Sequence, residues 1–165
     1  GGPITEANTE SFENAFKMHL INNQILVQSV IPGMIKEGYG RIVNIISTSV
    51  KAPIAGLGVS NTIRAAVANW AKTLSLELGE HGITVNNILP GFTNTNRLKS
   101  IIAKKSEKQG ISENEVIKTM MKSIPANRFG EAQETANAVA FLCSPAASYI
   151  NGINLPVDGG RTASL

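Results

Sequence analysis

Two histidines and one cysteine are the side chains of this sequence best suited to proton or thiol chemistry near neutral pH. His19 is the candidate proton donor, because an imidazole titrates near about 6.5 and suits general acid catalysis at neutral pH. The alternative is that His19 is an ordinary structural residue on an amphipathic helix. His81 lies in a Glu-His-Gly turn at an expected helix end, where a protonated imidazole suits the helix dipole, and we assign it no catalytic role.

The remaining residue types give no support to metal or hydrolase chemistry. One cysteine and two distant histidines form no ligand spacing, so we expect no metal site. Ser47 follows an expected buried strand, but no Gly-x-Ser-x-Gly motif occurs, and ordinary capping of a loop is the alternative role for its hydroxyl. Cys143 lies among Ala, Phe and Leu, which predicts a small residue buried in the core.

The composition is typical of one globular domain. The 165 residues are 42% hydrophobic and 16% charged, which is enough for one sizeable core. A formal net charge of +3, mostly scattered along the chain, is too small to indicate nucleic-acid binding. No apolar run approaches the ~20 residues needed to cross a bilayer, so we expect no membrane segment. A single cysteine also fits a reducing, cytoplasmic location.

Helical and strand patterns alternate along the chain. Apolar residues at three- and four-residue steps predict a long helix from Thr9 to about Lys36. Pro32 falls inside that pattern and predicts a kink or a change of helical segment near the C-terminal end of the helix. The next expected elements are a buried strand at 41–46, a helix at 61–79 and a strand at 83–89.

The second half of the chain contains an excursion and then returns to the sheet. Residues 92–131 are polar with two weaker helical patterns, near 94–105 and 112–123, and we interpret them as a flap that covers the substrate. An Ala-rich helix at 133–144 and a short strand at 153–157 follow. A strand, a helix and a strand in this order imply a right-handed parallel crossover, so the predicted fold class is α/β.

Several stretches of the chain resemble, in order, the short-chain dehydrogenase/reductase family. They are the opening GGP, then GRIVNIIS, RAAVANWAKTLSLEL, GITVNNILPGFTNT and the tail from RFGEAQ to VDGG. Their order and mutual spacing carry the resemblance, and the tail is most similar to 3-oxoacyl carrier-protein reductases. The resemblance implies that residues 1–165 form the C-terminal portion of a doubly wound parallel-sheet, Rossmann-like single domain.

The resemblance also implies that part of the family's fold lies before residue 1. The glycine-rich phosphate loop of the family, G-x-x-x-G-x-G, does not occur in this sequence. Gly1-Gly2-Pro3 matches the end of the family's fourth strand, beside the cofactor ribose. We therefore expect a fragment, or one piece of a cleaved or split protein. The alternative is a complete small α/β domain that begins at Gly1.

Four positions correspond to the catalytic residues of the family. There a Tyr transfers the proton, a Lys four residues later lowers its pKa and holds the ribose, a Ser binds the carbonyl and an Asn completes the relay. The matching residues here are Ser60, Arg64, Ser47 and His19, respectively, so Ser47 alone keeps the family's residue type. Ser60 is too weak an acid to replace a phenol, which lowers the expected rate by about 10²- to 10⁴-fold. Arg64 can still bind ribose hydroxyls or phosphate, and His19 is the candidate substitute donor.

A further segment resembles the family's contact with the nicotinamide carboxamide, made by backbone groups and a Thr hydroxyl. The alternative is that Pro-Gly simply ends a strand here. The residues that the resemblance assigns to NAD or NADP binding are Gly1, Gly2, Arg64, Pro90, Gly91, Phe92 and Thr95. The residue that chooses between NAD and NADP belongs to the expected missing part.

Two functions follow from the resemblance. The first is an NAD(P)-dependent oxidoreductase, similar to 3-oxoacyl reductases, that acts on an unknown small-molecule carbonyl or alcohol. The alternative is a non-catalytic, nucleotide-sensing or scaffold subunit. The helices at 9–36 and 61–79 pack across a two-fold axis in the family, which implies a homodimer or homotetramer. Trp70, on the second helix, is expected either in the chain's own core or in that interface.

Overall fold

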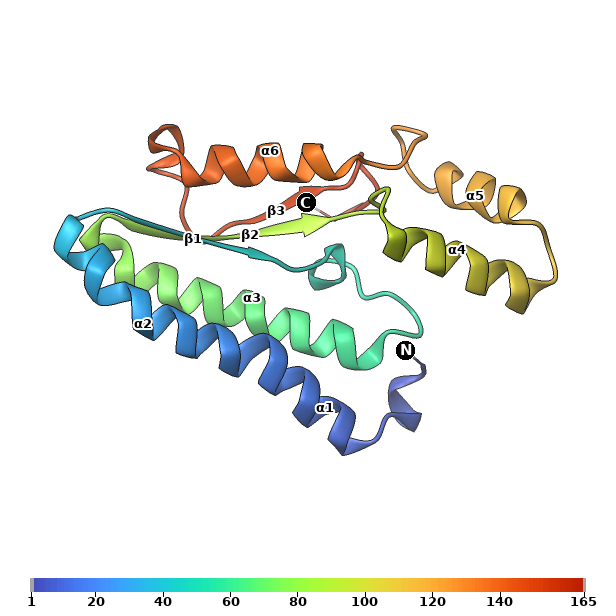
Figure 1. Ribbon diagram of the computed structural model, residues 1–165, viewed down its shortest axis with the longest axis horizontal. Helices are drawn as coiled ribbons and strands as arrows, with labels where there is room; N and C mark the ends of the chain where they lie inside the picture. The colour runs from blue at the N-terminus through green and yellow to red at the C-terminus, as the bar shows by residue number, and fades with distance from the viewer. Residues whose placement is uncertain (1, 165) are drawn as a thin grey trace.

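The computed structural model describes residues 2–164, and its centre is a parallel sheet with helices on both faces (Figure 1). The strands β1 (Gly40–Ile45), β2 (Ile83–Pro90) and β3 (Asn154–Val157) lie in the order β1-β2-β3. Gly40 pairs with Ile83, and Pro90 pairs with Val157. The predicted α/β class is therefore confirmed, and each predicted strand lies within a residue or so of its expected position.

The two faces of the sheet are covered by different helices. On one face lie α1 (Thr9–Phe16), a π-helical turn (Lys17–Ile21), α2 (Asn22–Glu37) and α3 (Gly58–Leu78), while α6 (Ala132–Cys143) covers the other face (Figure 1). Because successive side chains of β2 point to opposite faces, Ile83 and Val85 pack under α2 and α3, whereas Ile88 packs against Leu142 of α6. Short 3₁₀ turns occupy Ile4–Glu6, Thr48–Val50, Gly79–His81 and Pro145–Ala147.

The long N-terminal helix forms, but its irregular segment is not where Pro32 predicted it. The helix α2 runs through Pro32 to Glu37 and ends at Gly38, whose φ of 60° is left-handed. Pro32 and Gln28 are both exposed, so the carbonyl that loses its amide partner can bind water. The irregular segment is instead the π-helical turn Lys17–Ile21, which contains His19. Such turns occur frequently at functional sites.

The structure bears on two further predictions. Trp70 packs half-buried against core residues of its own chain, and its indole Nε1 donates a hydrogen bond to Gln24 Oε1 at 2.8 Å. Trp70 therefore packs in its own chain, as one of the two predictions had it, and a role in a subunit interface stays a prediction. Cys143 is exposed, so its prediction as a core residue was wrong. Leu142 is the buried residue of α6, and the next residue along a helix turns about 100° away from it.

The segment 92–131 forms a pair of helices beyond the end of the sheet (Figure 1). The helices α4 (Asn96–Gln109) and α5 (Glu113–Lys122) match the two weaker helical patterns. They share a small core of their own, which contains Leu98, Ile102, Val116 and Met120. A bridge between Thr93 and Gly130 joins the two ends of the segment, so its attachment to the sheet is narrow.

Buried asparagines tie the C-terminal part of the chain to β2. Asn86 has no exposed surface, and its Nδ2 donates to the carbonyl of Ile150 at 2.8 Å while its Oδ1 accepts from the amide of Ile153 at 3.1 Å. Asn151 Oδ1 accepts from the amide of Val85, and Asn151 Nδ2 donates to the carbonyl of Ser75. These bonds hold β3 in register, and the sequence analysis did not find them.

Candidate functional site

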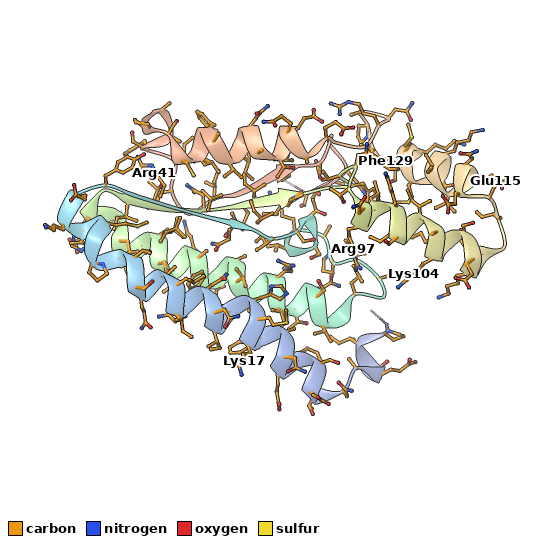
Figure 2. The ribbon with its side chains drawn as sticks, in the orientation of Figure 1. Lys17, Arg41, Arg97, Lys104, Glu115 and Phe129 are labelled. Atoms are coloured by element: carbon orange, nitrogen blue, oxygen red, sulfur yellow. The ribbon has the colours of Figure 1, made fainter. Side chains whose placement is uncertain are left out.

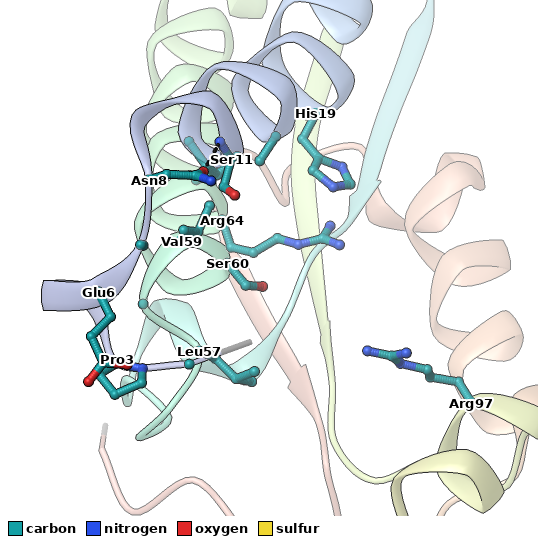
Figure 3. A pocket seen from close by; sticks show the side chains of 15 residues that line it. Pro3, Glu6, Asn8, Ser11, His19, Leu57, Val59, Ser60, Arg64 and Arg97 are labelled. Atoms are coloured by element: carbon teal, nitrogen blue, oxygen red, sulfur yellow. Dashed lines mark hydrogen bonds between the residues drawn. The ribbon is translucent and has the colours of Figure 1, made fainter. Parts of the chain in front are cut away.

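A cavity of about 580 Å³ opens beside the N-terminal end of α3 (Figure 3). Because α3 begins after the loop that follows β1, this end of the helix lies on the carboxyl side of the parallel strands, where open α/β sheets bind ligands. The ionisable and hydroxyl-bearing residues of its lining are Glu6, Ser11, His19, Ser60, Arg64 and Arg97. Three of the four predicted catalytic residues therefore meet in one cavity.

His19 and Arg64 form the centre of this group. Both also line a second cavity of about 210 Å³ that reaches β1, and Arg64 Nη1 donates to the carbonyl of Ile45 at 3.3 Å. Burial, and then the positive charge of Arg64, hold the pKa of His19 below its ordinary value of 6.5. Burial also lowers the pKa of Arg64 below its ordinary value. The imidazole is therefore mostly neutral at neutral pH, beside a partly desolvated guanidinium.

Ser60 lies one helical turn before Arg64 on α3, so both side chains share the face of the helix that lines the cavity. Ser60 is exposed, and Figure 3 shows its hydroxyl beside the stem of Arg64. A serine hydroxyl at this place can donate or accept a hydrogen bond to a ligand, but it is a poor acid.

Ser47 is the predicted catalytic residue that the structure does not bring into the cavity. It lines neither of the two cavities that contain His19. Its Oγ accepts a hydrogen bond from the amide of Ser49 at 3.1 Å and so caps the 3₁₀ turn Thr48–Val50. The local capping role that competed with a catalytic role is therefore present in the structure.

The segment Pro90-Gly91 continues the sheet at the carboxyl end of β2. The amide of Gly91 donates to the carbonyl of Val157 at 3.0 Å. A Cβ atom at Gly91 would lie 2.6 Å from the Cβ of Asp158, so close packing between the ends of β2 and β3 requires a glycine here. Neither Pro90 nor Gly91 lines the 580 Å³ cavity.

Phe92 and Thr95 start the helical pair. The ring of Phe92 packs edge-on against Phe129, with centroids 6.3 Å apart, and the guanidinium of Arg161 lies over it at 4.3 Å. Thr95 is exposed and caps α4, since its Oγ1 accepts from the amide of Leu98 at 3.4 Å. Neither residue lines the 580 Å³ cavity, so a direct role in cofactor binding stays a prediction.

Of the two glycines that open the chain, the structure describes Gly2. Gly1 lies outside the described residues. Gly2 lines the cavity, its amide donates to the carbonyl of Gly56 at 2.7 Å, and it forms a parallel bridge with Leu57. A Cβ atom added at Gly2 would have no described atom within 4 Å apart from the adjacent residues. A ligand therefore has room against the backbone of Gly2.

Arg97, for which the sequence predicted no role, also lines the cavity. It lies in the first turn of α4, and Figure 3 shows its side chain reaching toward the cavity from the side opposite Arg64. The signal in the sequence was its position two residues after Thr95, the last residue of the segment that resembles the nicotinamide contact.

Other kinds of site find no counterpart in the part of the chain that the structure describes. Between residues 2 and 164, no three side chains of His, Cys, Asp or Glu gather closely enough to hold a metal ion. Within the same range, no helix is long and apolar enough to cross a membrane.

The parallel sheet, the helices on both faces and the cavity at the carboxyl side of the strands define a doubly wound α/β protein of the nucleotide-binding class. A family model described as "Enoyl-(Acyl carrier protein) reductase" matches residues 1–162. The chain therefore belongs to the short-chain dehydrogenase/reductase family, whose members are NAD(P)-dependent oxidoreductases.

Curated relatives cover the whole chain. It is 37% identical over 167 residues to the NADPH-dependent reductase BacG of Bacillus subtilis (strain 168), an alignment that spans 100% of this chain and 64% of that protein. It is 34% identical to the 7alpha-hydroxysteroid dehydrogenase of Escherichia coli (strain K12), again over 100% of this chain and 61% of that protein. The chain thus spans somewhat less than two thirds of the length of these relatives.

Solved structures show the same fold. The crystal structure of YwfH, an NADPH-dependent reductase involved in bacilysin biosynthesis, superposes with a TM-score of 0.92 at 31% identity and covers 100% of this chain and 65% of that one. The L-sorbose reductase of Gluconobacter frateurii, complexed with NADPH and L-sorbose, has a TM-score of 0.92 at 28% identity, with 100% and 64% covered. The predicted C-terminal part of a Rossmann-like fold is thereby confirmed.

Proposed function

We propose that this chain supplies the substrate side of an NAD(P)-dependent reductase that acts on a small-molecule carbonyl. The observation that carries the proposal is the meeting of His19, Ser60 and Arg64 in one cavity, with His19 on a π-helical turn. The names of relatives support it, since BacG is an NADPH-dependent reductase and the L-sorbose reductase was crystallised with NADPH. The positions of Ser60 and Arg64, where the family has Tyr and Lys, make the site atypical.

The residues present fit the ribose and nicotinamide half of NAD(P). Arg64 offers guanidinium donors inside the cavity, Gly2 leaves open space for a ligand, and the exposed hydroxyl of Thr95 stands at the end of the Pro90-Gly91 segment. When bound, the nicotinamide would supply the hydride to the carbonyl carbon. Arg64 would bind the ribose hydroxyls and neutralise negative charge, but it cannot relay a proton, because a guanidinium is not deprotonated in proteins.

In this proposal, His19 donates the proton to the carbonyl oxygen from an imidazole nitrogen. A pKa below 6.5 reduces the protonated fraction at neutral pH but makes each imidazolium a stronger acid. Ser60 contributes a hydrogen bond to the same oxygen and no net proton. The reaction should therefore be fastest at mildly acidic pH, where more of His19 carries its proton.

The environment of Ser47 favours the second candidate function, a non-catalytic subunit. In the family this serine binds the carbonyl, but here its Oγ accepts the Ser49 amide and faces neither cavity of His19. In that case the fold would sense a nucleotide or pair with an active relative. Detectable turnover of any carbonyl by the complete gene product rules this candidate out.

Residues 1–165 are proposed to be part of one Rossmann-like domain, with 92–131 as a flap over the substrate. The separate core of α4 and α5, and the narrow attachment at Thr93 and Gly130, support a segment that moves as a unit. Arg97, a positively charged residue of this flap, lines the cavity. A cytoplasmic location is part of the same proposal.

We also propose a homodimer or homotetramer built on the outer face of α1 and α2. Large apolar side chains that remain exposed there are Phe16, Met18, Ile21, Ile25, Leu26 and Val30. Such a patch along one face of a long helix is typical of an interface between subunits. Light scattering should give at least twice the monomer mass, and a monomer at high concentration would contradict the proposal.

Two measurements test the proposed function. In thermal-shift titrations of the complete gene product, NAD or NADP should raise the melting temperature, and NAD(P)H should be consumed in the presence of small ketones. In an NMR titration, the substitution Arg64→Met should raise the pKa of His19, because it removes the nearby positive charge. An unchanged His19 pKa would show that the two side chains do not act together.

A further inference from the structure

We infer that the substrate of this site carries a carboxylate, which Arg97 binds while the reacting carbonyl lies at His19 and Ser60. The inference rests on the proposed reductase function and adds the substrate class: short oxo acids. Its basis is a single cavity with two guanidinium groups that enter from different elements, Arg64 from α3 and Arg97 from α4 (Figure 3).

Arg97 differs from the other arginines of the described chain. Arg41 donates to backbone carbonyls and lies over Tyr39, Arg128 forms an ion pair with Glu134, and Arg161 lies over Phe92. Arg64 donates to Ile45. Between residues 2 and 164, by contrast, no hydrogen bond, ion pair or aromatic contact engages the guanidinium of Arg97, although its side chain lines the cavity. Its donors are free for a ligand.

The charge around the cavity also favours an anion. Glu6 is the carboxylate of its lining, and Figure 3 shows the Glu6 side chain at the N-terminal end, directed away from Arg97. The lining is therefore net positive near Arg64 and Arg97. A guanidinium binds a carboxylate through two parallel N–H···O bonds, and such a fork fixes orientation as well as charge. A ligand held in this way at Arg97 would extend its other end toward His19.

Size and position fit a small acid. The volume of about 580 Å³ lies within the range of about 300 to 1,000 Å³ that is typical of small-molecule sites. Figure 2 shows Arg97 at the end of α4 nearest the sheet, whereas Lys104 lies farther along the same helix and does not line the cavity. Binding of the carboxylate would also connect α4 to α3 and so close the proposed flap over the substrate.

The same guanidinium could meet an anion from another source, the phosphates of the cofactor. The experiment separates the two sources. The complete gene product is assayed with NADPH and NADH against pyruvate, 3-oxobutanoate and 4-oxopentanoate, each beside its methyl ester, which keeps the carbonyl and removes the charge. The variants are Arg97→Gln and a matched control, Lys99→Gln, which removes the same charge from an exposed position of α4 outside the cavity.

We expect the wild-type protein to prefer an acid to its ester, and Arg97→Gln to lower kcat/KM for that acid by about 10- to 100-fold, the loss typical of one charged hydrogen-bonding partner. Turnover of the esters and the behaviour of Lys99→Gln should be unchanged. Equal turnover of acid and ester by the wild-type protein, or equal losses on both in Arg97→Gln, would overturn the inference while leaving the reductase intact. A raised KM for NADPH with an unchanged KM for the acid would assign Arg97 to the cofactor and overturn it as well.

If no carbonyl is reduced, the proposed function fails, and direct binding decides the inference on its own. Calorimetry with 3-oxobutanoate should then show binding that Arg97→Gln weakens and Lys99→Gln does not. Absence of binding, or equal weakening by both variants, would refute a carboxylate site at Arg97.

Discussion

The substitution Asn86→Ala should cost the protein a large part of its stability. The side-chain amide of Asn86 has no exposed surface and satisfies two backbone groups, the carbonyl of Ile150 and the amide of Ile153. Alanine would leave both without a partner. Each unpaired buried group costs about 1 to 3 kcal/mol, so we expect the free energy of unfolding to fall by about 2 to 6 kcal/mol. A typical domain has a total of about 5 to 15 kcal/mol.

Urea denaturation followed by circular dichroism measures this loss. With a slope of about 2 kcal/mol per M, the midpoint should fall by about 1 to 3 M. The control is Asn69→Ala, at an exposed position of α3, where the midpoint should stay the same or rise slightly, since alanine favours a helix. If Asn86→Ala shifts the midpoint no more than Asn69→Ala does, the hydrogen bonds of Asn86 do not hold β3 in register as described.

Three further predictions concern charge, proton transfer and cofactor binding. Arg128 holds the pKa of Glu134 at about 2, below its ordinary 4.5. The stabilisation from this pair should therefore be complete above pH 4.5 and disappear as pH falls through about 2. An NMR titration in which Glu134 has its ordinary pKa would contradict this prediction. In the complete gene product, the combined change Ser60→Tyr, Arg64→Lys and His19→Asn should regain about 10² or more of the ketone turnover that His19→Asn alone removes, and more than its parts predict; single changes that simply multiply would contradict this. Residues 1–165 alone should bind neither NAD nor NADP tightly, because they contain no glycine-rich phosphate loop; saturable calorimetric binding at low micromolar cofactor would overturn this.

Local patterns predicted the elements well because each has a clear period or a clear end. The run from Ile83 to Leu89 is apolar and β-branched and stops at Pro90-Gly91, and the observed strand is Ile83–Pro90. The helices of the 92–131 segment were also found from their weaker helical patterns, and in the structure Ser112 and Glu115 form a capping box at the start of α5. A π-helical turn such as Lys17–Ile21 has no such local signal, and so it was missed.

Contacts between distant residues explain most of what the sequence could not predict. The partners of Asn86 lie more than sixty residues away along the chain, and nothing local distinguishes Asn86 from its neighbour Asn87. Arg97 lines the cavity because the first turn of α4 lies at the end of the helix nearest the sheet (Figure 2), which no local pattern encodes. Cys143 was assigned to the core from its apolar neighbours, but the phase of α6 places Leu142 there instead.

The candidate site was predicted in part. The resemblance selected His19, Ser60 and Arg64, and the structure brings all three to one cavity. Ser47 was selected by the same argument, yet its hydroxyl caps a turn. An alignment carries residue positions from a family to a chain, but it does not carry the hydrogen bonds that a side chain makes in its new surroundings.

The central claim is that His19 is the proton donor of a reductase, and the pH dependence of kcat/KM tests it most directly. This profile reports the ionisation of the free enzyme. For the wild-type complete gene product, kcat/KM for ketone reduction should fall as pH rises through a pKa below 6.5. His19→Gln should lower kcat/KM by about 10²- to 10⁴-fold and remove that pH dependence. A His19→Gln variant that keeps both the rate and the pH profile of the wild-type protein would contradict the account.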